Sequence, residues 1–133
     1  MTRTGKLRFA AGLTFAVGLA LWTWKLLDPQ PVPEPIRAAL GYWGWLPFVA
    51  AKCLHLSGYA FLVVAGQVAV ARRYRLVVAA FLIAHGAATE VGQTYVPGRD
   101  GNERDVAIDA AGVVAGTLLL RRVTRERPAP EPR

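Results

Sequence analysis

Four long apolar stretches, separated by short polar or basic segments, set the pattern of this chain. The first is close to the ~20 residues that a helix needs to cross ~30 Å of hydrocarbon, and the fourth is shorter. Pro97 and Gly98 end the third stretch with a turn signal. The pattern predicts an all-α fold, an integral membrane bundle of four transmembrane helices within residues 9–120. The expected helices cover residues 9–27, 46–71, 76–96 and 105–120.

The first stretch follows a basic segment, as the apolar region of a secretion signal does. Its apolar run is longer than that of a typical signal, and no small-residue cleavage site follows Trp22 and Trp24, so we expect a retained helix. Residues 28–35 are too rich in proline for a helix and predict a stiff surface loop. The aromatic side chains beyond the loop predict a membrane–water interface. They are Tyr42, Trp43 and Trp45.

The basic residues concentrate in three segments, residues 1–8, 72–75 and 121–133. Four crossings place all three segments on one side, and the positive-inside rule makes that side the cytoplasm. We therefore expect both termini in the cytoplasm. The C-terminal segment, residues 121–133, is expected to be a disordered basic tail. The net charge of +7 is then a signal of topology, so the expected partner is the lipid bilayer and not a nucleic acid.

Cysteine and histidine are scarce, with one Cys and two His in the chain. These counts exclude a disulfide framework and a zinc finger. The primary expectation is a protein with neither a bound metal nor another cofactor.

Ionisable side chains interrupt three of the apolar stretches. A charge near the bilayer centre costs on the order of 2.5–3.5 kcal/mol, so such residues face a partner or water. Lys52 and His55 lie in the second stretch, Glu90 in the third and Asp109 in the fourth. Counted at ~1.5 Å per residue from the outer helix ends, all four lie in the outer half of the membrane. His85 lies near its middle.

Helical spacing places these residues on common faces. Lys52, His55 and Tyr59 are spaced i, i+3 and i+7, and Glu90 and Gln93 are spaced i and i+3. In the fourth stretch a similar spacing aligns two acidic residues with two glycines, which suit close helix packing. These four are Asp105, Asp109, Gly112 and Gly116. We expect a polar pocket open to the outside. Its expected lining is Lys52, His55, Tyr59, Glu90, Gln93, Arg99, Asp105 and Asp109.

A purely structural interpretation stands beside this one. Lys52 and Glu90 could form an ion pair that locks two helices together. Asp105 could serve only to stabilise a helix N-terminus, where acidic residues are favourable. His85 could be a packing or hydrogen-bonding residue. The arginine clusters fit orientation anchors on either interpretation.

Three motifs carry a resemblance to a known family. They are KCLHLSGY (52–59), EVGQTYVPGRDGNERD (90–105) and DAAGVVAG (109–116). In this order they resemble the VanZ-like family, small membrane proteins named for a teicoplanin-resistance factor, over about residues 50–117. Asp109 stands where that family commonly has Asn. The resemblance implies a four-helix membrane domain in a bacterial cell envelope, located in the cytoplasmic membrane, without a settled activity.

Several functions remain open at this point. The first is binding of an anionic or amphiphilic ligand at the outer leaflet, such as a glycopeptide or a lipid-linked cell-wall precursor. The second is an enzyme in which His55 works with Glu90 or Asp109 in acid–base or metal chemistry. No nucleophile elbow, HExxH motif or phosphate-binding glycine loop is present, so binding is favoured over catalysis. The others are an ion path through His85, in an oligomer, and a structural partner of another envelope complex.

Overall fold

A computed structural model describes residues 2–29, 34–41 and 45–125 of the chain. Within these ranges the fold is all-α, as expected, and four long helices dominate it. A short helix and a single 3-10 turn lie in the connections. The elements are α1 (Arg3–Leu26), α2 (Glu34–Gly41), α3 (Leu46–Ala69), η1 (Arg72–Tyr74), α4 (Arg75–Gln93) and α5 (Glu103–Arg125).

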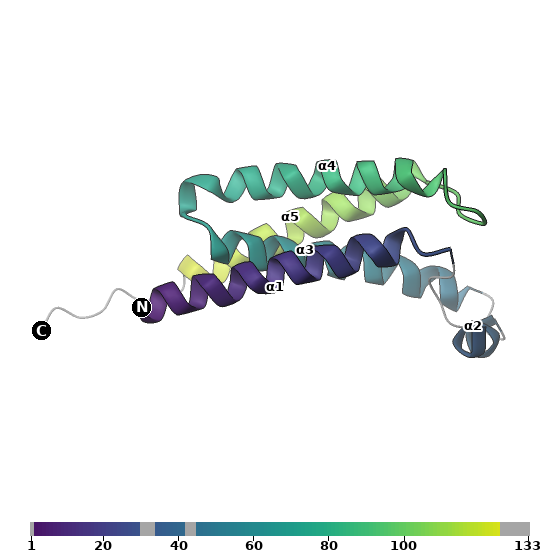
Figure 1. Cartoon of the computed structure of the whole chain (residues 1–133), viewed down its shortest axis with the longest axis horizontal. Helices are drawn as coiled ribbons and strands as arrows, with labels where there is room; N and C mark the ends of the chain where they lie inside the picture. The colour runs from purple at the N-terminus through teal and green to yellow at the C-terminus, as the bar shows by residue number, and fades with distance from the viewer. Residues whose placement is uncertain (1, 30–33, 42–44, 126–133) are drawn as a thin grey trace, which may run out of the picture.

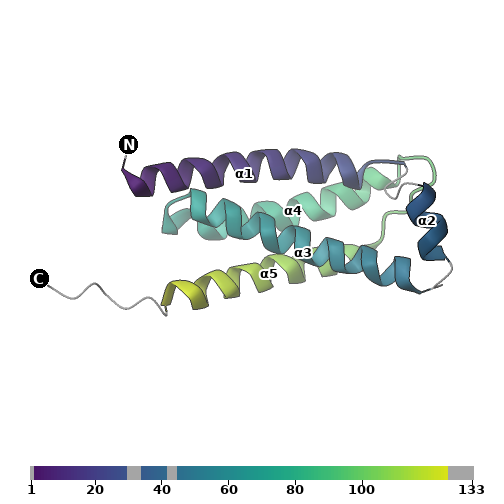
Figure 2. The ribbon, with the colours of Figure 1, turned by 90° about the horizontal axis from the view of Figure 1, so that it is seen from below.

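The four long helices lie side by side and alternate in direction (Figure 1). Helices α1 and α4 run one way and α3 and α5 the other, so α3 and α5 are parallel neighbours (Figures 1 and 2). We call the end that holds α2 and residues 94–102 the loop end. We call the opposite end, where α1 begins and α5 ends, the arginine end. Helix α3 is central, because it contacts α1, α4 and α5 and packs most extensively against α5.

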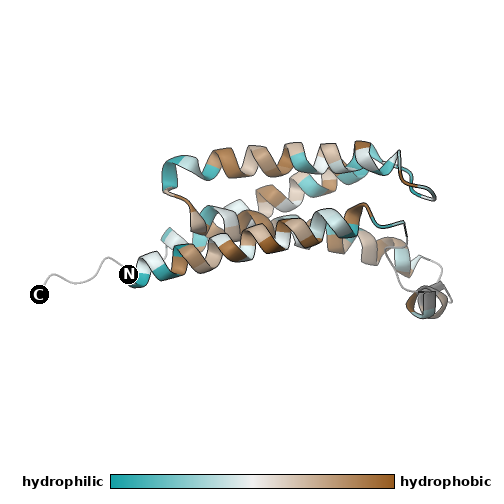
Figure 3. Cartoon of the chain, in the orientation of Figure 1, coloured by the Kyte–Doolittle hydropathy of each residue, from teal (hydrophilic) through white to brown (hydrophobic). Residues whose placement is uncertain are grey.

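Three helical segments are long and apolar enough to cross a membrane: Arg3–Leu26, Leu46–Ala69 and Arg72–Gln93. Helix α5, which contains the fourth expected span, is not among them. Large apolar side chains such as Leu13, Val17 and Leu21 are exposed along the outside of α1. Apolar residues prevail along the middle of the bundle (Figure 3). Such a surface suits contact with hydrocarbon better than contact with water.

The helix boundaries differ from the expected ones at several points. Helix α1 begins at Arg3 and not at residue 9, because the Thr2 hydroxyl caps it by accepting a 3.2 Å hydrogen bond from the Gly5 amide. Helices α3 and α4 end two and three residues earlier than expected, at Ala69 and Gln93. Helix α5 continues through Arg125, so the first part of the expected disordered tail is helical. The rest of that tail, residues 126–133, lies outside the described residues.

The loop expected over residues 28–35 gives way to helix α2 at Glu34. Pro35 does not prevent this, since a proline is tolerated in the first turn, where its missing N–H has no helical acceptor. Of the aromatic residues expected at an interface, Trp45 is exposed directly before α3. Tyr42 and Trp43 lie outside the part of the chain that the structure describes.

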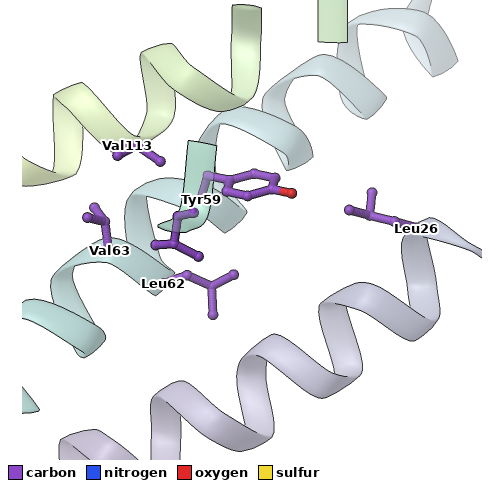
Figure 4. Close-up of a cluster of buried hydrophobic side chains, with 6 residues drawn as sticks. Leu26, Tyr59, Leu62, Val63 and Val113 are labelled. Atoms are coloured by element: carbon purple, nitrogen blue, oxygen red, sulfur yellow. The ribbon is translucent and has the colours of Figure 1, made fainter. Parts of the chain in front are cut away.

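The buried core is small and centres on α3. Tyr59, Leu62 and Val63 of α3 pack with Val113 of α5 and Leu26 of α1, and Tyr59 lies between the last two (Figure 4). The two glycines expected to form a packing surface face α3. A Cβ at Gly112 would overlap the Leu56 carbonyl oxygen, and one at Gly116 would lie 2.5 Å from that of Ala60. The absence of both side chains therefore brings the α3 and α5 backbones together, which aligns the polar residues at the loop end.

Candidate functional site

Two charged pairs connect α3 to α5 near the loop end. Lys52 of α3 forms an ion pair with Asp105 of α5. One helical turn further along both helices, His55 Nδ1 lies 2.9 Å from Asp109 Oδ1. Because the helices run parallel, the spacing of Lys52 and His55 on one matches the spacing of the two aspartates on the other. The ion pair between Lys52 and Glu90, which the structural interpretation offered as an alternative, is not the one observed, since Lys52 pairs with Asp105.

Glu90 is held in place by the segment that follows its own helix. The Asn102 amide donates to Oε2 at 2.8 Å, and Gln93 Nε2 donates to Oε1 at 3.2 Å. The chain comes close enough here that a Cβ at Gly101 would overlap the Glu90 carbonyl oxygen. The segment 94–102 thus folds back over the end of α4 and fixes one carboxylate oxygen, and Gln93 at the end of the same helix fixes the other.

Three buried side chains from three helices converge into one cluster, His55 of α3, Glu90 of α4 and Asp109 of α5. One potential ligand atom from each lies within 4.8 Å of the other two. The three residues are only 8 %, 4 % and 0 % exposed. Asp109 Oδ2 is buried and forms no hydrogen bond within the described chain. Gly86 makes room for it, because a Cβ there would lie 3.0 Å from this oxygen.

The charge balance of this cluster favours a cation. It combines two carboxylates with one imidazole, and the neighbouring Lys52–Asp105 pair is neutral as a whole. Two carboxylates at this separation repel each other strongly where water is excluded. A bound cation would remove that repulsion, whereas an anion would add to it.

A second polar network begins at Tyr59 and leads away from the cluster. Thr23 Oγ1 donates to the Leu19 carbonyl at 2.7 Å, so it accepts from His85 Nε2, 2.8 Å away. A neutral His85 then accepts at Nδ1 from the Tyr59 hydroxyl, at 2.9 Å. Tyr59 is therefore tied to His85 and Thr23, and His85 has a hydrogen-bonding role.

Trp22 of α1 stands between the two networks. Its ring meets His55 edge to face at 6.1 Å and Tyr59 at 6.3 Å. Gly58 allows this approach, because a Cβ there would lie 2.7 Å from the indole. The same indole lines an apolar hollow of about 390 Å³ between α1 and α3, with Gly18 and Leu62. The Trp22 ring thus lies between the polar cluster and this apolar hollow.

Arg99, expected in the pocket, is bound elsewhere. Its Nη2 donates to the Leu26 carbonyl at 3.2 Å and so joins the segment 94–102 to the end of α1. Sequence reasoning missed Trp22, Gly86 and Asn102. Asn102 lies inside the 90–105 motif, which was a usable signal. The pattern gave no comparable signal for Trp22, because α1 carries no ionisable residue at its middle.

Comparison of the chain with known protein families, with curated proteins and with solved structures gave no match.

Proposed function

We propose that this chain is a VanZ-like protein of the bacterial cytoplasmic membrane that holds a divalent cation near the outer face and uses it to bind an anionic amphiphile. In this proposal α5 is the fourth crossing, both termini are cytoplasmic and the loop end faces outward. The alternating directions of the long helices support it, as do the arginines gathered at the opposite end. The charges of α5 are compatible with a crossing because Asp105 and Asp109 are paired with α3.

The observation that carries the cation site is the convergence of His55, Glu90 and Asp109 within 4.8 Å. Imidazole suits zinc, iron and nickel, whereas carboxylates suit manganese and magnesium, so the mixed set fits Mn²⁺ or Zn²⁺ best. Three protein ligands would leave coordination positions open for another molecule. Gln93 and Asn102 would orient the Glu90 carboxylate, as outer hydrogen bonds orient metal ligands generally.

The departure of this chain from the VanZ-like motif fits the same proposal. Asp109 replaces a commonly found Asn, and a carboxylate is a far stronger ligand for a hard cation than a neutral amide. The carboxylate also gives the cluster its second negative charge. The cation site is therefore proposed for this chain and not for the family as a whole.

The expected anion pocket is modified by the observed contacts. Lys52 and Arg99, which were to receive an anionic ligand, already bind Asp105 and the Leu26 carbonyl. A bound cation would supply the positive charge in their place. The apolar hollow beside Trp22 would take the apolar portion of the same ligand. A glycopeptide with a lipid tail and a lipid-linked cell-wall precursor both have this combination of groups.

The cation site is tested by metal binding to the purified full-length protein. Protein in dodecylmaltoside is stripped with a chelator, titrated with Mn²⁺ and with Zn²⁺, and measured by calorimetry and by elemental analysis. We expect about one equivalent per chain, with affinity reduced at least tenfold in His55→Ala, Glu90→Gln and Asp109→Asn. Glu103→Gln is the matched control, because Glu103 is an exposed carboxylate in the first turn of α5. Wild-type protein that binds neither metal, or cluster variants that bind like the control, would refute the site.

The ligand is tested separately in cells. Strains that express the wild type, Asp109→Asn or Glu103→Gln at equal membrane levels are compared for tolerance to teicoplanin. We expect tolerance to be higher in the strains that express the wild type or Glu103→Gln than in the strain that expresses Asp109→Asn. Equal tolerance in all three strains, with metal binding intact in the wild type, would overturn the glycopeptide ligand and leave the cation site standing.

A further inference from the structure

Arginines from three elements converge at the arginine end of the bundle. Arg72 of η1, Arg75 of α4 and Arg121 and Arg125 of α5 line a cavity of about 320 Å³. Thr117 and Thr124 add hydroxyl groups to its wall, and no lining residue is acidic. The cavity lies at the opposite end of the bundle from the His55, Glu90 and Asp109 cluster. It is therefore a different site with the opposite charge.

Gln67 anchors one of these arginines. It is 1 % exposed, and its Nε2 donates to the Arg75 carbonyl at 3.2 Å and to Thr117 Oγ1 at 3.0 Å. Arg75 Nε in turn donates to the Gln67 carbonyl at 3.3 Å. These contacts fix the Arg75 guanidinium through its Nε and leave its two terminal nitrogens for a ligand. A guanidinium held in this way is suited to bind two oxygens of a phosphate.

Within the described ranges, no acidic side chain pairs with the arginines that line this cavity. Arg72 and Arg121 line the same cavity as Arg75, so their like charges repel one another. None of the salt bridges within the described ranges involves Arg72, Arg75 or Arg121. An anion between these guanidinium groups would relieve their mutual repulsion and accept several charge-assisted hydrogen bonds.

A second hollow, of about 400 Å³, adjoins the arginine cavity and shares Arg72, Arg75 and Thr124 with it. The rest of its wall is mostly apolar and comes from α1, α3, α5 and the residue that follows α3. It includes Leu7, Val68, Val70, Leu120 and Val123. A ligand that occupies both hollows has a phosphate at one end and an apolar portion at the other. Phospholipids combine these groups, and basic pockets between membrane helices on the cytoplasmic side bind lipid headgroups.

We propose that the arginine cavity binds the phosphate of an anionic phospholipid from the leaflet at this end of the bundle. The proposal rests on the membrane setting of the proposed function but is independent of the cation site. Arg75 and Arg121 contact the phosphate from α4 and α5, and the apolar hollow receives the glycerol and the beginning of an acyl chain. The arginines are then ligand-binding residues in addition to orientation anchors.

The test is lipid retention by the full-length protein in dodecylmaltoside, measured by native mass spectrometry during titration with phosphatidylglycerol. We expect one retained lipid per chain, with apparent affinity lowered at least fivefold in Arg75→Gln and in Arg72→Gln/Arg121→Gln. Arg73→Gln is the matched control, because Arg73 stacks over the Tyr74 ring at 4.8 Å and does not line the cavity. The double variant keeps the test valid if loss of Arg75 disturbs folding, because Arg72 and Arg121 do not take part in the Gln67 hydrogen bonds.

Three outcomes would overturn the proposal. The first is equal retention by the variants and the control. The second is equal retention of phosphatidylcholine, which would show that the apolar hollow alone selects the ligand. The third is displacement of the lipid by millimolar inorganic phosphate, which would identify a free phosphate as the ligand. Asp109→Asn, assayed in parallel, separates the two sites, since we expect it to lose the metal and retain the lipid.

Discussion

Replacement of Gly112 by Ala tests the close contact between α3 and α5 most directly. The new Cβ would overlap the Leu56 carbonyl oxygen and would lie 3.1 Å from the carbonyl carbon and 3.2 Å from Cα. These are backbone atoms, so no side-chain rotation relieves the overlap. Ordinary contacts between carbon and carbonyl oxygen are ~3.3 Å or longer, and the helices must therefore separate by about 1 Å.

The cost has two parts. Overpacking of this kind typically costs ~1–3 kcal/mol. The His55–Asp109 hydrogen bond, 2.9 Å long, joins the same two helices about one turn away and would lengthen with the separation. A hydrogen bond to a charged group contributes ~1.5–3 kcal/mol, of which a partial loss is expected. The helix propensity of Ala offsets at most ~1 kcal/mol, and less where the unfolded state stays helical in detergent. We expect a net loss of about 2–4 kcal/mol in the free energy of unfolding.

The assay is SDS titration of the protein in dodecylmaltoside, followed by tryptophan fluorescence. Gly12→Ala is the control, because a Cβ at Gly12 makes only an ordinary 3.8 Å contact with Ala69. We expect the control to lie within about 0.5 kcal/mol of the wild type, as is usual for substitutions away from packed contacts. If Gly112→Ala matched the control, the backbones of α3 and α5 would not approach each other as described, and the paired residues at the loop end would lose their alignment.

Two further predictions concern the polar contacts around the cluster. In double-mutant cycles measured by SDS unfolding, Lys52 and Asp105 should show a coupling energy of about 1–2 kcal/mol, because the pair is largely buried. The coupling energy between Lys52 and Glu90 should be less than half of that value. A larger coupling for the second pair would contradict the observed pairing. Tyr59→Phe keeps the buried ring but leaves His85 without its donor, so it should lower stability by about 1–2 kcal/mol without changing metal affinity. Reduced metal affinity in this variant would place Tyr59 in the cation site.

The polar stripes could be predicted because they follow from helical spacing. Lys52, His55 and Tyr59 were aligned by their positions alone, as were Asp105 and Asp109 on the other helix. Their partners could not be predicted, because the spacing fixes a face of a helix but not its rotation relative to the neighbouring helices. This is why the structural interpretation pairs Lys52 with Glu90, whereas Lys52 binds Asp105 in the structure. Depth in the membrane does not distinguish Glu90 from Asp105 as the partner, because both acids are expected on the outer side.

The missed features arise from tertiary contacts and from capping. Thr23 and Trp22 join the site only because α1 packs beside α3, a neighbour relation that the pattern of apolar residues does not specify. The early start of α1 depends on one hydrogen bond to Thr2. Proline density alone predicts a loop over residues 28–35, whereas helix α2 begins at Glu34 because Pro35 stands in its first turn. An N-cap residue and a first-turn proline are the sequence signals of these two boundaries.

The pairing of α3 with α5 also constrains how the chain is made. The partners of Lys52 and His55 lie 53 and 54 residues further along the sequence. At ~5–20 residues per second, the ribosome needs roughly 3–10 s to synthesise that interval. In the proposed membrane setting, Lys52 and His55 of α3 lack their partners during this time. Helix α5 in turn is too polar to insert unless Asp105 and Asp109 can pair with these two side chains. We therefore expect α5 to insert in the same step in which Lys52 and His55 of α3 gain their partners. Nascent chains that stop before Asp105 should accordingly be poor substrates for stable insertion and good substrates for membrane quality-control proteases.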